Sequence, residues 1–302
     1  MDKKKILITG GSGTVGKHLS EMLLKKGYEV AHLSRSEGNH PKIKTYLWDV
    51  DQQQIDENCI DGVDTIVHLA GAGIADSRWT DKRKDIIITS RTDSIALIYD
   101  LLKRKTNQVK NVVSASAAGF YSDRKNTLLS ETDSPNTDFL AHSCVLWEKA
   151  VDKGAALGLR VVKFRTGVIL DLETGALPEI AKPIKWGVGS PLGSGKQWIS
   201  WIHLDDVVNM YLKGIEDQRL KGAYNMSTPY PLTNEALTKA IANQLDKKLW
   251  APKVPAFALK LMLGEMSAVV LGSTKMSVQK IEETGFKFKF PEVKAALKDI
   301  YG

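Results

Sequence analysis

The chain has 302 residues, of which 43% are hydrophobic and 25% are charged. This composition supplies a sizeable core in one large domain or two modest ones. Lysine and arginine outnumber aspartate and glutamate by 42 to 35, and the resulting charge of +7 could attract phosphorylated ligands. The basic residues are scattered among acids, and the densest run, Lys3–Lys5, indicates a solvated flank. We therefore expect no nucleic-acid partner.

Two cysteines are too few for a disulfide framework or a metal cluster, and they indicate a reducing compartment. The apolar run near the N-terminus is too short for a signal peptide. The stretch Val254–Leu271 is apolar but contains Lys260 and Glu265, so it predicts one or two packed helices rather than a membrane span. We expect a cytoplasmic protein without a membrane partner.

The first two-thirds of the chain alternate short β-rich runs with helix-length segments. Helices are predicted at 16–26 and 83–104. The predicted strands are Lys5–Thr9, Glu29–Ser34, Thr45–Trp48, Thr65–Leu69, Asn111–Ser114 and Arg160–Phe164. Strands that are apolar on both faces and alternate with helices indicate a parallel sheet covered on both sides. The predicted fold class is α/β, a Rossmann-type doubly wound sheet with a smaller C-terminal lobe that would hold substrate.

The composition of the chain changes after about Gly167, where glycines and prolines become frequent. We assign residues 1–167 to the dinucleotide-binding domain and 168–302 to the smaller lobe, with 252–302 as a distinct tail. A strand at 223–226 is expected to return to the large sheet. A helix is expected to open near Thr233 or Asn234, either of which could cap it.

The strongest motif follows the first strand, where glycines recur every third residue between Gly10 and Gly16. Glycines at this place allow a tight turn, a close approach of backbone to pyrophosphate, and close packing of helix on strand. The N-terminus of the next helix offers free N–H groups to a diphosphate. The candidate cofactor-binding residues of this turn are Gly10, Ser12, Gly13, Thr14, Val15 and Gly16.

The end of the second strand indicates which dinucleotide is bound. An NAD site usually places an acid there, roughly 20 residues after the glycines, on the ribose 2′-hydroxyl. Here Ser34 and Arg35 occupy the strand end, with no acid. Because a guanidinium fits a 2′-phosphate, these residues predict NADP(H) as the cofactor.

Several segments together resemble the extended short-chain dehydrogenase/reductase superfamily: Thr9–Gly16, His68–Gly71 and Ser114–Ser116. The segments 70–79, 90–91 and 193–206 narrow the resemblance to the subgroup called epimerase family proteins, sometimes labelled nucleoside-diphosphate-sugar epimerases or cell-division-inhibitor-like proteins. That subgroup carries a C-terminal domain of unknown function, which residues 254–301 resemble. The resemblance also leaves room for a homodimer through the helices near 83–103 and 139–153.

The resemblance implies further contacts with the cofactor. Asp49 would lie near the adenine. Leu69, Ala70, Gly71 and Ala72 would line the adenosine and diphosphate side. Ser114 and Ala115, with Ser116, would lie below the nicotinamide, and Arg165, Thr166 and Gly167 would lie near the nicotinamide and the substrate entrance.

The catalytic set of the superfamily is a Ser, a Tyr-x-x-x-Lys pair and an Asn, with the Tyr as acid or base. Ser116 matches the Ser. The pair is missing: its positions hold Leu140 and Cys144, or Phe139 and Ser143 if the alignment moves by one residue. This departure puts the usual alcohol–ketone redox chemistry in doubt.

The Asn position of the set corresponds to Ser90. Tyr121, on the loop that faces substrate in relatives, and His142, on the helix that lost its Tyr, are candidate replacements. We take Ser116 and Tyr121 as the candidate catalytic residues. Each of these side chains also has an ordinary structural interpretation, as a strand-end cap, a packed aromatic or a helix-surface residue.

The substrate region departs from sugar-nucleotide relatives, which carry a diphosphate-binding Arg where this chain has Ile199. The neighbourhood is aromatic instead, with Trp186, Trp198 and Trp201, although tryptophans are most often core residues. The nearby cations are Lys182, Lys185 and Lys196. A nucleotide sugar is therefore not favoured over a small, partly apolar or aromatic substrate.

His203, Asp205 and Asp206 do not form a metal-ligand set by spacing alone, and we expect no metal. One of the two aspartates is expected to cap a helix at 207–213. Two functions remain open. The first is an NADP(H)-dependent, epimerase-like oxidoreductase acting on a small molecule, and the second is a cofactor-loaded sensor or scaffold without turnover.

Overall fold

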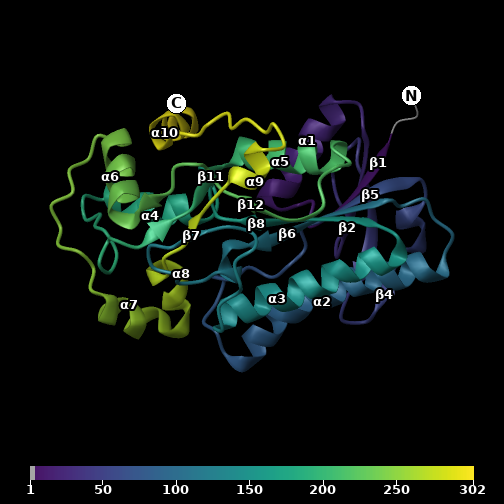
Figure 1. Ribbon diagram of the computed structural model, residues 1–302, viewed down its shortest axis with the longest axis horizontal. Helices are drawn as coiled ribbons and strands as arrows, with labels where there is room; N and C mark the ends of the chain where they lie inside the picture. The colour runs from purple at the N-terminus through teal and green to yellow at the C-terminus, as the bar shows by residue number, and fades with distance from the viewer. Residues whose placement is uncertain (1–3) are drawn as a thin grey trace.

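A single sheet of eight strands runs through the molecule in the order β12-β8-β6-β5-β1-β2-β3-β4 (Figure 1). The computed structural model describes residues 4–302, so Lys3 of the basic run lies outside the described residues. Neighbouring strands are parallel except β3 and β4, and the predicted doubly wound α/β class is confirmed. The strands are β1 (Lys5–Thr9), β2 (Glu29–Ser34), β3 (Lys44–Asp49), β4 (Gln54–Ile55), β5 (Val63–His68), β6 (Asn111–Ala117), β8 (Arg160–Thr166) and β12 (Gly222–Met226).

Both faces of the sheet are covered by helices, which is why β1 is buried along its whole length. Helices α1 (Thr14–Lys25) and α5 (Leu204–Glu216) pack on one face, and α2 (Asp81–Arg104) and α3 (Phe139–Asp152) lie side by side on the other (Figure 1). The chain runs from β1 outward through β2, β3 and β4, then returns to β5 and continues through β6, β8 and β12. The direction of winding therefore reverses between β1 and β5, where parallel sheets of this kind bind ligands.

Lys5 corrects the expectation of a solvated basic flank. Only 9% of the residue is exposed, because β1 begins at this position between two neighbouring strands. The amine reaches the sheet edge, where it donates to the carbonyl of Asp61 at 3.0 Å and lies 3.4 Å from the Glu29 carboxylate. The aliphatic stem is buried while the charge finds polar partners, as is common for long basic side chains.

The second lobe has a core of its own, formed around Leu177, Ile184, Trp201, Leu237 and Ile241. It contains helices α4 (Ala176–Lys185), α6 (Asn234–Gln244) and α10 (Val293–Tyr301). Its strand pairs are β9 (Val168–Leu170) with β11 (Trp201–His203) and β10 (Trp198–Ile199) with β13 (Leu232–Thr233). The remaining elements are η1 (Glu57–Ile60), η2 (Ala118–Phe120), β7 (Leu128–Leu129), η3 (Lys153–Leu157), α7 (Ala256–Leu263), η4 (Gly264–Met266), α8 (Ser267–Leu271), β14 (Lys275–Met276) and α9 (Gln279–Glu282).

The two lobes exchange more segments of chain than the predicted boundary after residue 167 implies. Strand β12 joins the large sheet as expected, but α5 and Phe286 also pack into the core of that sheet. Strand β14, near the C-terminus, pairs with β7 of the first half. Residues from the last third of the chain therefore complete the first domain as well as building the second.

Two helix starts can be compared with their predicted caps. Thr233 accepts a hydrogen bond from the Ala236 N–H and caps α6, as one of the two alternatives predicted. For α5 the aspartate prediction was wrong: His203 is the N-cap and accepts from the Asp205 N–H at 3.1 Å. Asp206 is fully buried instead and accepts the backbone N–H groups of Lys289 and Phe290, which fastens the C-terminal tail to α5.

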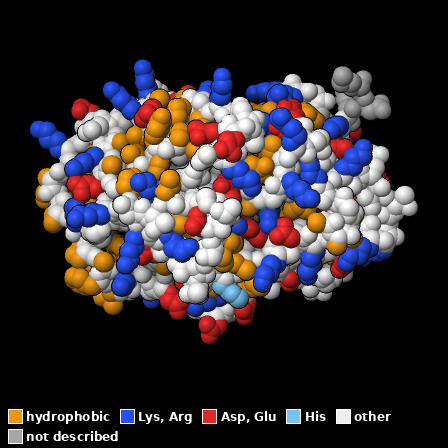
Figure 2. Space-filling view, viewed as in Figure 1, with side chains coloured by type: hydrophobic (Ala, Val, Ile, Leu, Met, Phe, Trp, Pro, Cys, Tyr) orange, Lys and Arg blue, Asp and Glu red, His pale blue; other side chains and the backbone are white. Residues whose placement is uncertain are grey.

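The apolar stretch 254–271 forms α7, η4 and α8, in agreement with the prediction of short helices. It is less packed than expected, because Phe257, Leu261 and Met262 are largely exposed. Figure 2 shows a patch of apolar side chains in the region of α7, and elsewhere on this face basic and acidic side chains are interspersed. Within residues 4–302, no helix has both the length and the apolar character needed to cross a membrane.

Gly16 is expected to be irreplaceable in the packing of α1 on β1. A Cβ placed there would lie 2.4 Å from the Gly10 carbonyl oxygen and 2.7 Å from Gly11 Cα, which are backbone atoms that cannot move aside. Gly16→Ala should therefore lower the free energy of unfolding by about 1–3 kcal/mol, measured by urea denaturation.

Gly13→Ala is the matched control, since a Cβ there meets only the Gly10 oxygen, at 3.4 Å. It should cost about 1 kcal/mol or less, because it adds no backbone clash and alters only a helix N-cap that makes no side-chain hydrogen bond. Equal losses for the two variants would contradict this account of the turn.

Candidate cofactor and substrate site

The glycine turn lies at the carboxyl end of β1, beside the end of β5. Gly10 has a φ of +69°, and a Cβ there would lie 3.0 Å from the backbone carbonyl of Leu69. The Thr9 hydroxyl accepts the backbone N–H groups of Leu69 and Ala70, both at 3.1 Å. The turn is therefore held directly against the loop that follows β5.

His32 supports the turn from beneath, a role that the sequence did not indicate. A Cβ at Gly11 would lie 2.5 Å from the His32 ring, so only glycine fits there. The ring Nε2 lies 2.8 Å from the Ser20 hydroxyl. Burial and the nearby His40 lower the pKa of His32 to about 4, so the ring is neutral near pH 7 and acts as a packing element.

The N-terminus of α1 is open toward solvent. Its N-cap, Gly13, provides no side-chain hydrogen bond, and the first turn carries no acid. Ser12 and Gly13 are exposed, and Thr14 and Val15 are half-buried. The Thr14 hydroxyl lies 2.8 Å from that of Thr174, so a loop of the second lobe reaches this turn. An uncapped helix end without acids fits a diphosphate.

The ends of β2 and β3 lie along the same edge of the sheet. Arg35 is exposed, and within residues 4–302 its guanidinium makes no hydrogen bond or ion pair. Ser34 is half-buried and its hydroxyl accepts the Ser36 N–H at 3.4 Å. Asp49 ends β3, is exposed, and accepts the Gln52 N–H. The three predicted residues therefore lie along one edge of the sheet. At the end of β2 this edge offers the guanidinium of Arg35 and no acid.

Ser90 and Arg91 of α2 hold the loop that follows β5. The Ser90 hydroxyl accepts the Ala72 N–H at 3.0 Å, and Arg91 donates to the Ala72 carbonyl at 2.9 Å. Gly71 is exposed and lies against Arg91, since a Cβ there would be 3.0 Å from Arg91 Cζ. Ser90, at the family's Asn position, therefore positions backbone.

A cleft of about 320 Å³ opens between the sheet edge and the second lobe. Thr166 and Gly167 line it, at the place that the resemblance implied. Leu140, Ser143 and Cys144 line it too, so both residues of the first alignment that the resemblance offered for Tyr and Lys face the cleft, and only Ser143 of the second. The other lining residues come from three parts of the chain: Ile74 and Arg91; Ala117, Ala118, Gly119, Ser122 and Trp147; Val168, Trp198, Ile199, Ser200, Ala268, Val269, Gly272 and Thr274.

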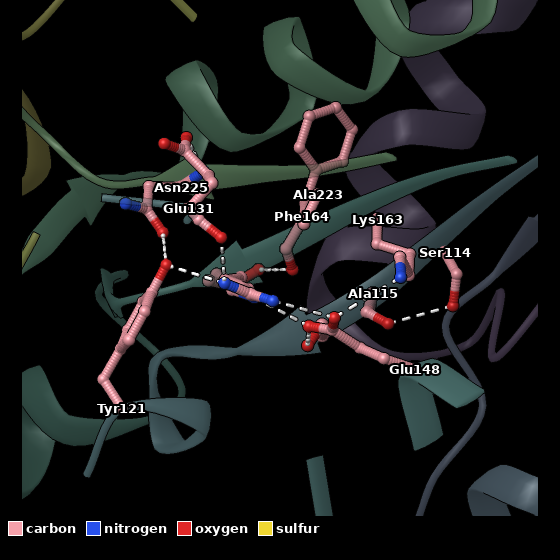
Figure 3. Close-up of polar contacts among 12 residues, drawn as sticks. Ser114, Ala115, Tyr121, Glu131, Glu148, Lys163, Phe164, Ala223 and Asn225 are labelled. Atoms are coloured by element: carbon pink, nitrogen blue, oxygen red, sulfur yellow. Dashed lines mark hydrogen bonds and ion pairs between the residues drawn. The ribbon is translucent and has the colours of Figure 1, made fainter. Parts of the chain in front are cut away.

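Ser116 and Arg165 are not among the residues that line this cleft, because both belong to a buried ionic network on α3. Ser116 donates to Glu148 Oε1 at 2.7 Å, and Arg165 donates to both oxygens of Glu148 at 2.8 and 3.0 Å. Figure 3 labels Glu148, where these dashed contacts meet. Lys163 bridges Glu148 and Asp152. Burial alone would raise the pKa of Glu148, but the hydrogen bonds and charge of Arg165, with Lys163 and Ser116, hold it below its usual range.

Tyr121 joins the same network from the other side. Its side chain is fully buried, and its hydroxyl accepts from Arg165 and lies 2.8 Å from Asn225 Oδ1 (Figure 3). Burial, despite the charge of Arg165, raises the pKa of Tyr121 to about 12. Since Tyr121 does not line the cleft and its hydroxyl is already satisfied, its placement gives no support to the predicted role as an acid, nor does that of Ser116.

Ser114 and Ala115 lie within β6 and are not among the residues that line the cleft. The Ser114 hydroxyl lies 3.2 Å from His68 Nδ1, and Nε2 of the same ring lies 2.9 Å from the Ser94 hydroxyl. His68 is fully buried, and burial with the charge of Arg91 lowers its pKa to about 3. This neutral imidazole links β5, β6 and α2 and has no exposed atom for catalysis. Ala115 is half-buried in the same strand.

Of the three tryptophans near the expected substrate region, only Trp198 lines the cleft. Trp201 is fully buried in the second lobe, and Trp186 is 70% exposed. Lys182 lies over the Trp186 ring and Lys185 over Tyr301, and neither lines the cleft. Lys196 is also absent from its lining, and His142 is exposed on the surface of α3. Arg91 does line the cleft, and the sequence had given no indication that it could contact a ligand.

Across residues 4–302, no group of three His, Cys, Asp or Glu side chains is arranged to hold a metal ion. His203 and Asp206 are engaged in fastening α5 and the C-terminal tail.

The geometry defines a Rossmann-type dinucleotide-binding protein with a second lobe over its cleft. The model of the NAD dependent epimerase/dehydratase family matches residues 6–227, and the chain belongs to that family. Residues 254–300 match a domain of unknown function, DUF1731, as the resemblance implied for the tail.

Relatives of the same overall length carry the corresponding description. An epimerase family protein of Staphylococcus saprophyticus is 34% identical over 302 residues, covering 98% of this chain and 99% of the relative. Epimerase family protein YfhF of Bacillus subtilis is 33% identical, covering 98% and 97%.

Two solved structures have a similar overall fold. The human epimerase family protein SDR39U1, determined with NADPH, is 26% identical with a TM-score of 0.86, and 98% of each chain is covered. A nucleoside-diphosphate sugar epimerase of Corynebacterium glutamicum is 31% identical with a TM-score of 0.80, covering 98% of this chain and 57% of that one.

Glu148→Gln is expected to lower the free energy of unfolding by about 3 kcal/mol, because it leaves the buried Arg165 guanidinium without its counter-charge. Urea denaturation near pH 7 measures the loss. Glu57→Gln, at an exposed ion pair with Arg104, is the control and should change stability by less than about 1 kcal/mol.

The same pair gives a signed pH dependence. Because the folded-state pKa of Glu148 lies below its usual range, the stability it supplies is present above the unfolded-state pKa and is lost as pH falls through the folded-state value. The difference in stability between wild type and Glu148→Gln should therefore shrink on acidification. A difference that stays constant would contradict the assignment.

Proposed function

We propose that the protein binds NADP(H) across the carboxyl edge of its sheet and acts as an epimerase-like oxidoreductase on a small molecule. The observation that carries this proposal is the uncapped, acid-free N-terminus of α1 behind the glycine turn, at the point where the winding of the sheet reverses. The NADPH of the human relative's structure supports the choice of cofactor.

The residues available to hold the cofactor follow the edge of the sheet. The turn from Gly10 to Gly16 would take the diphosphate, with Ser34 and Arg35 at the 2′-phosphate and Asp49 near the adenine. Leu69, Ala70, Gly71 and Ala72 would line the diphosphate side. Ser114, Ala115, Thr166 and Gly167 would surround the nicotinamide, with Arg165 acting from behind through the ionic network rather than by contact. The bound nicotinamide would supply or accept hydride.

The cleft favours a small, partly apolar or aromatic substrate. Its apolar lining includes Leu140, Trp147, Trp198 and Ile199, and its volume of about 320 Å³ is at the small end of ligand pockets. Ser122, Ser143 and Ser200 also line the cleft, and their hydroxyls donate to Asp138, to the Leu140 carbonyl and to the Thr274 carbonyl. They are closer to a substrate in the cleft than Ser116 or Tyr121, which do not line it.

A second candidate function, a cofactor-loaded sensor or scaffold, is favoured by one specific observation. Leu140 and Cys144 occupy the cleft wall where the family's Tyr and Lys would stand, while Ser116 and Tyr121 are engaged in the ionic network. Burial raises the pKa of the Cys144 thiol to about 12, so it does not replace the missing proton donor near pH 7. We rank the enzyme first because a formed cleft adjoins the cofactor edge.

Fluorescence titration of cofactor-stripped protein with NADPH and NADH should show much tighter binding of NADPH. Arg35→Ala should remove most of that preference, roughly tenfold or more, because the guanidinium would pair with the 2′-phosphate. Arg104→Ala, at the opposite end of α2 from the cofactor edge, removes the same charge and should leave the preference intact. Equal affinity of wild type for the two cofactors would refute the NADP(H) assignment.

Nicotinamide absorbance, followed by stopped flow over a broad panel of small carbonyl compounds, should reveal oxidation of NADPH by at least one compound with an apolar or aromatic body. The cleft adjoins the place proposed for the nicotinamide, so a compound that fits it would approach the hydride. Failure with every compound, together with a lysate partner that binds only one redox state of the loaded protein, would favour the sensor.

A further inference from the structure

Arg91 brings an uncompensated positive charge to the wall of the cleft. It lies on α2, and its guanidinium donates to the carbonyls of Ile87 at 2.7 Å and Ala72 at 2.9 Å. Its Cζ lies 5.0 Å from the centre of the Trp147 ring. The side chain is thus fixed in direction, while other N–H groups of the same guanidinium have no acceptor among residues 4–302.

The contrast with Arg165 shows what Arg91 lacks. Arg165 is buried against the two oxygens of Glu148, whereas within residues 4–302 no carboxylate lies at ion-pair distance from Arg91. The adjacent thiol of Cys144 is neutral near pH 7, because burial raises its pKa to about 12. Burial lowers the pKa of Arg91, yet arginine keeps its proton in proteins. Arg91 is half-buried, and a cation that is partly removed from water without an anion is costly, so such an arrangement calls for an anionic ligand.

A second donor in the same wall also lacks a partner. The indole N–H of Trp147 is buried and makes no hydrogen bond in the described part of the chain. Buried polar groups are nearly always satisfied, so an orphan donor beside an uncompensated guanidinium indicates a missing acceptor. Trp147 and Arg91 both line the cleft, and the two observations are independent.

We propose that Arg91 and Trp147 form the anion subsite of the substrate cleft and that the substrate is a small carboxylic acid with an aromatic or apolar body. This inference rests on the proposed function, because it names the substrate class of the same cleft. One guanidinium matches one carboxylate in charge and in fork geometry. Phosphate is less suited, since Arg91 is the only cationic side chain that residues 4–302 contribute to the lining and a second negative charge would remain unpaired.

The body of the substrate would lie against the apolar part of the lining. Leu140, Trp198, Ile199 and Val269 provide flat and aliphatic contacts, and α8 of the second lobe contributes to this wall. A planar aromatic ring suits such a wall, because ring-on-ring and ring-on-aliphatic contacts add to the area buried. Arg91 would then fix the carboxylate end of the substrate, and Trp198 and its apolar neighbours would contact the ring end.

Benzoate and benzamide are the probes, because they share shape and differ in charge. Their dissociation constants are measured by calorimetry on the full-length protein, with and without saturating NADPH. Wild type should bind benzoate about tenfold or more tightly than benzamide, as expected for a charge-assisted fork. Arg91→Met should bring the two within about threefold, a difference of under 1 kcal/mol by the usual conversion.

Arg83→Met is the matched control on the same helix, because Arg83 is already paired with Asp76 and does not line the cleft. It should keep the benzoate preference. Arg91→Lys serves if Arg91→Met does not fold: the charge remains but the fork is lost, so the preference should survive while benzoate affinity falls a few-fold.

Three results would overturn the inference: wild type that binds benzoate no better than benzamide or not at all, Arg91→Met that retains the preference, or Arg91→Met that instead weakens NADPH. The last would identify the anion as a cofactor phosphate. NADPH titration of wild type separates this inference from the proposed function. If NADPH binds while benzoate does not, only the substrate class fails, and if NADPH does not bind, the proposed function itself fails.

Discussion

The contact between the ends of β1 and β5 is the constraint on which the rest of the structure depends. The Thr9 hydroxyl holds the backbone N–H groups of Leu69 and Ala70, and Gly10 touches the Leu69 carbonyl. From this junction α1 leaves to one face of the sheet and α2 to the other. The crevice between them exposes an uncapped helix end and the loop that carries Gly71 and Ala72. The glycine turn and the loop after β5, which are both proposed to hold the cofactor, meet at this junction.

The Glu148–Arg165 pair explains why the polar residues of β6 and β8 do not act in the cleft. Ser116 projects toward α3 and donates to Glu148. Tyr121 is drawn to the opposite side of Arg165 and to Asn225. The two candidate catalytic residues thus belong to a structural network, and the polar and aromatic lining of the cleft comes from Arg91, serines and tryptophans instead.

The two arginines near this edge of the sheet, Arg165 and Arg91, therefore differ in what their charges do. Arg165, fully countered, stabilises the joint between the first domain and the segment that carries Asn225. Arg91 has no carboxylate at ion-pair distance in the described residues, and the N–H groups it does not donate to Ile87 and Ala72 are the ones proposed to hold a ligand. The buried guanidinium of Arg165 and the half-buried one of Arg91 differ in whether a carboxylate lies at ion-pair distance.

Local pattern predicted the parts of the fold that depend on neighbouring residues. Strands β1 and β2 were predicted to the residue, and the other predicted strands of the sheet were displaced or shortened at their ends, because apolar runs and turns are local signals. The glycine turn was recognisable from its spacing after a strand, and Gly16 is required by backbone a few residues away, whereas Gly10 lies against Leu69 and Gly11 against the His32 ring. The family resemblance rested on the same local motifs and is confirmed.

The partners of polar side chains could not be read from the sequence, because they are separated by long stretches of chain. Tyr121 meets Asn225 across 104 positions, and Asp206 holds Lys289 across 83. Arg91 looked like any polar residue of a long helix, and Lys5 like a surface charge. The sequence by itself determined the sheet, the turn and the family. Only tertiary packing decided which charges are countered and which hydroxyls remain available, because burial and pairing are properties of the assembled core.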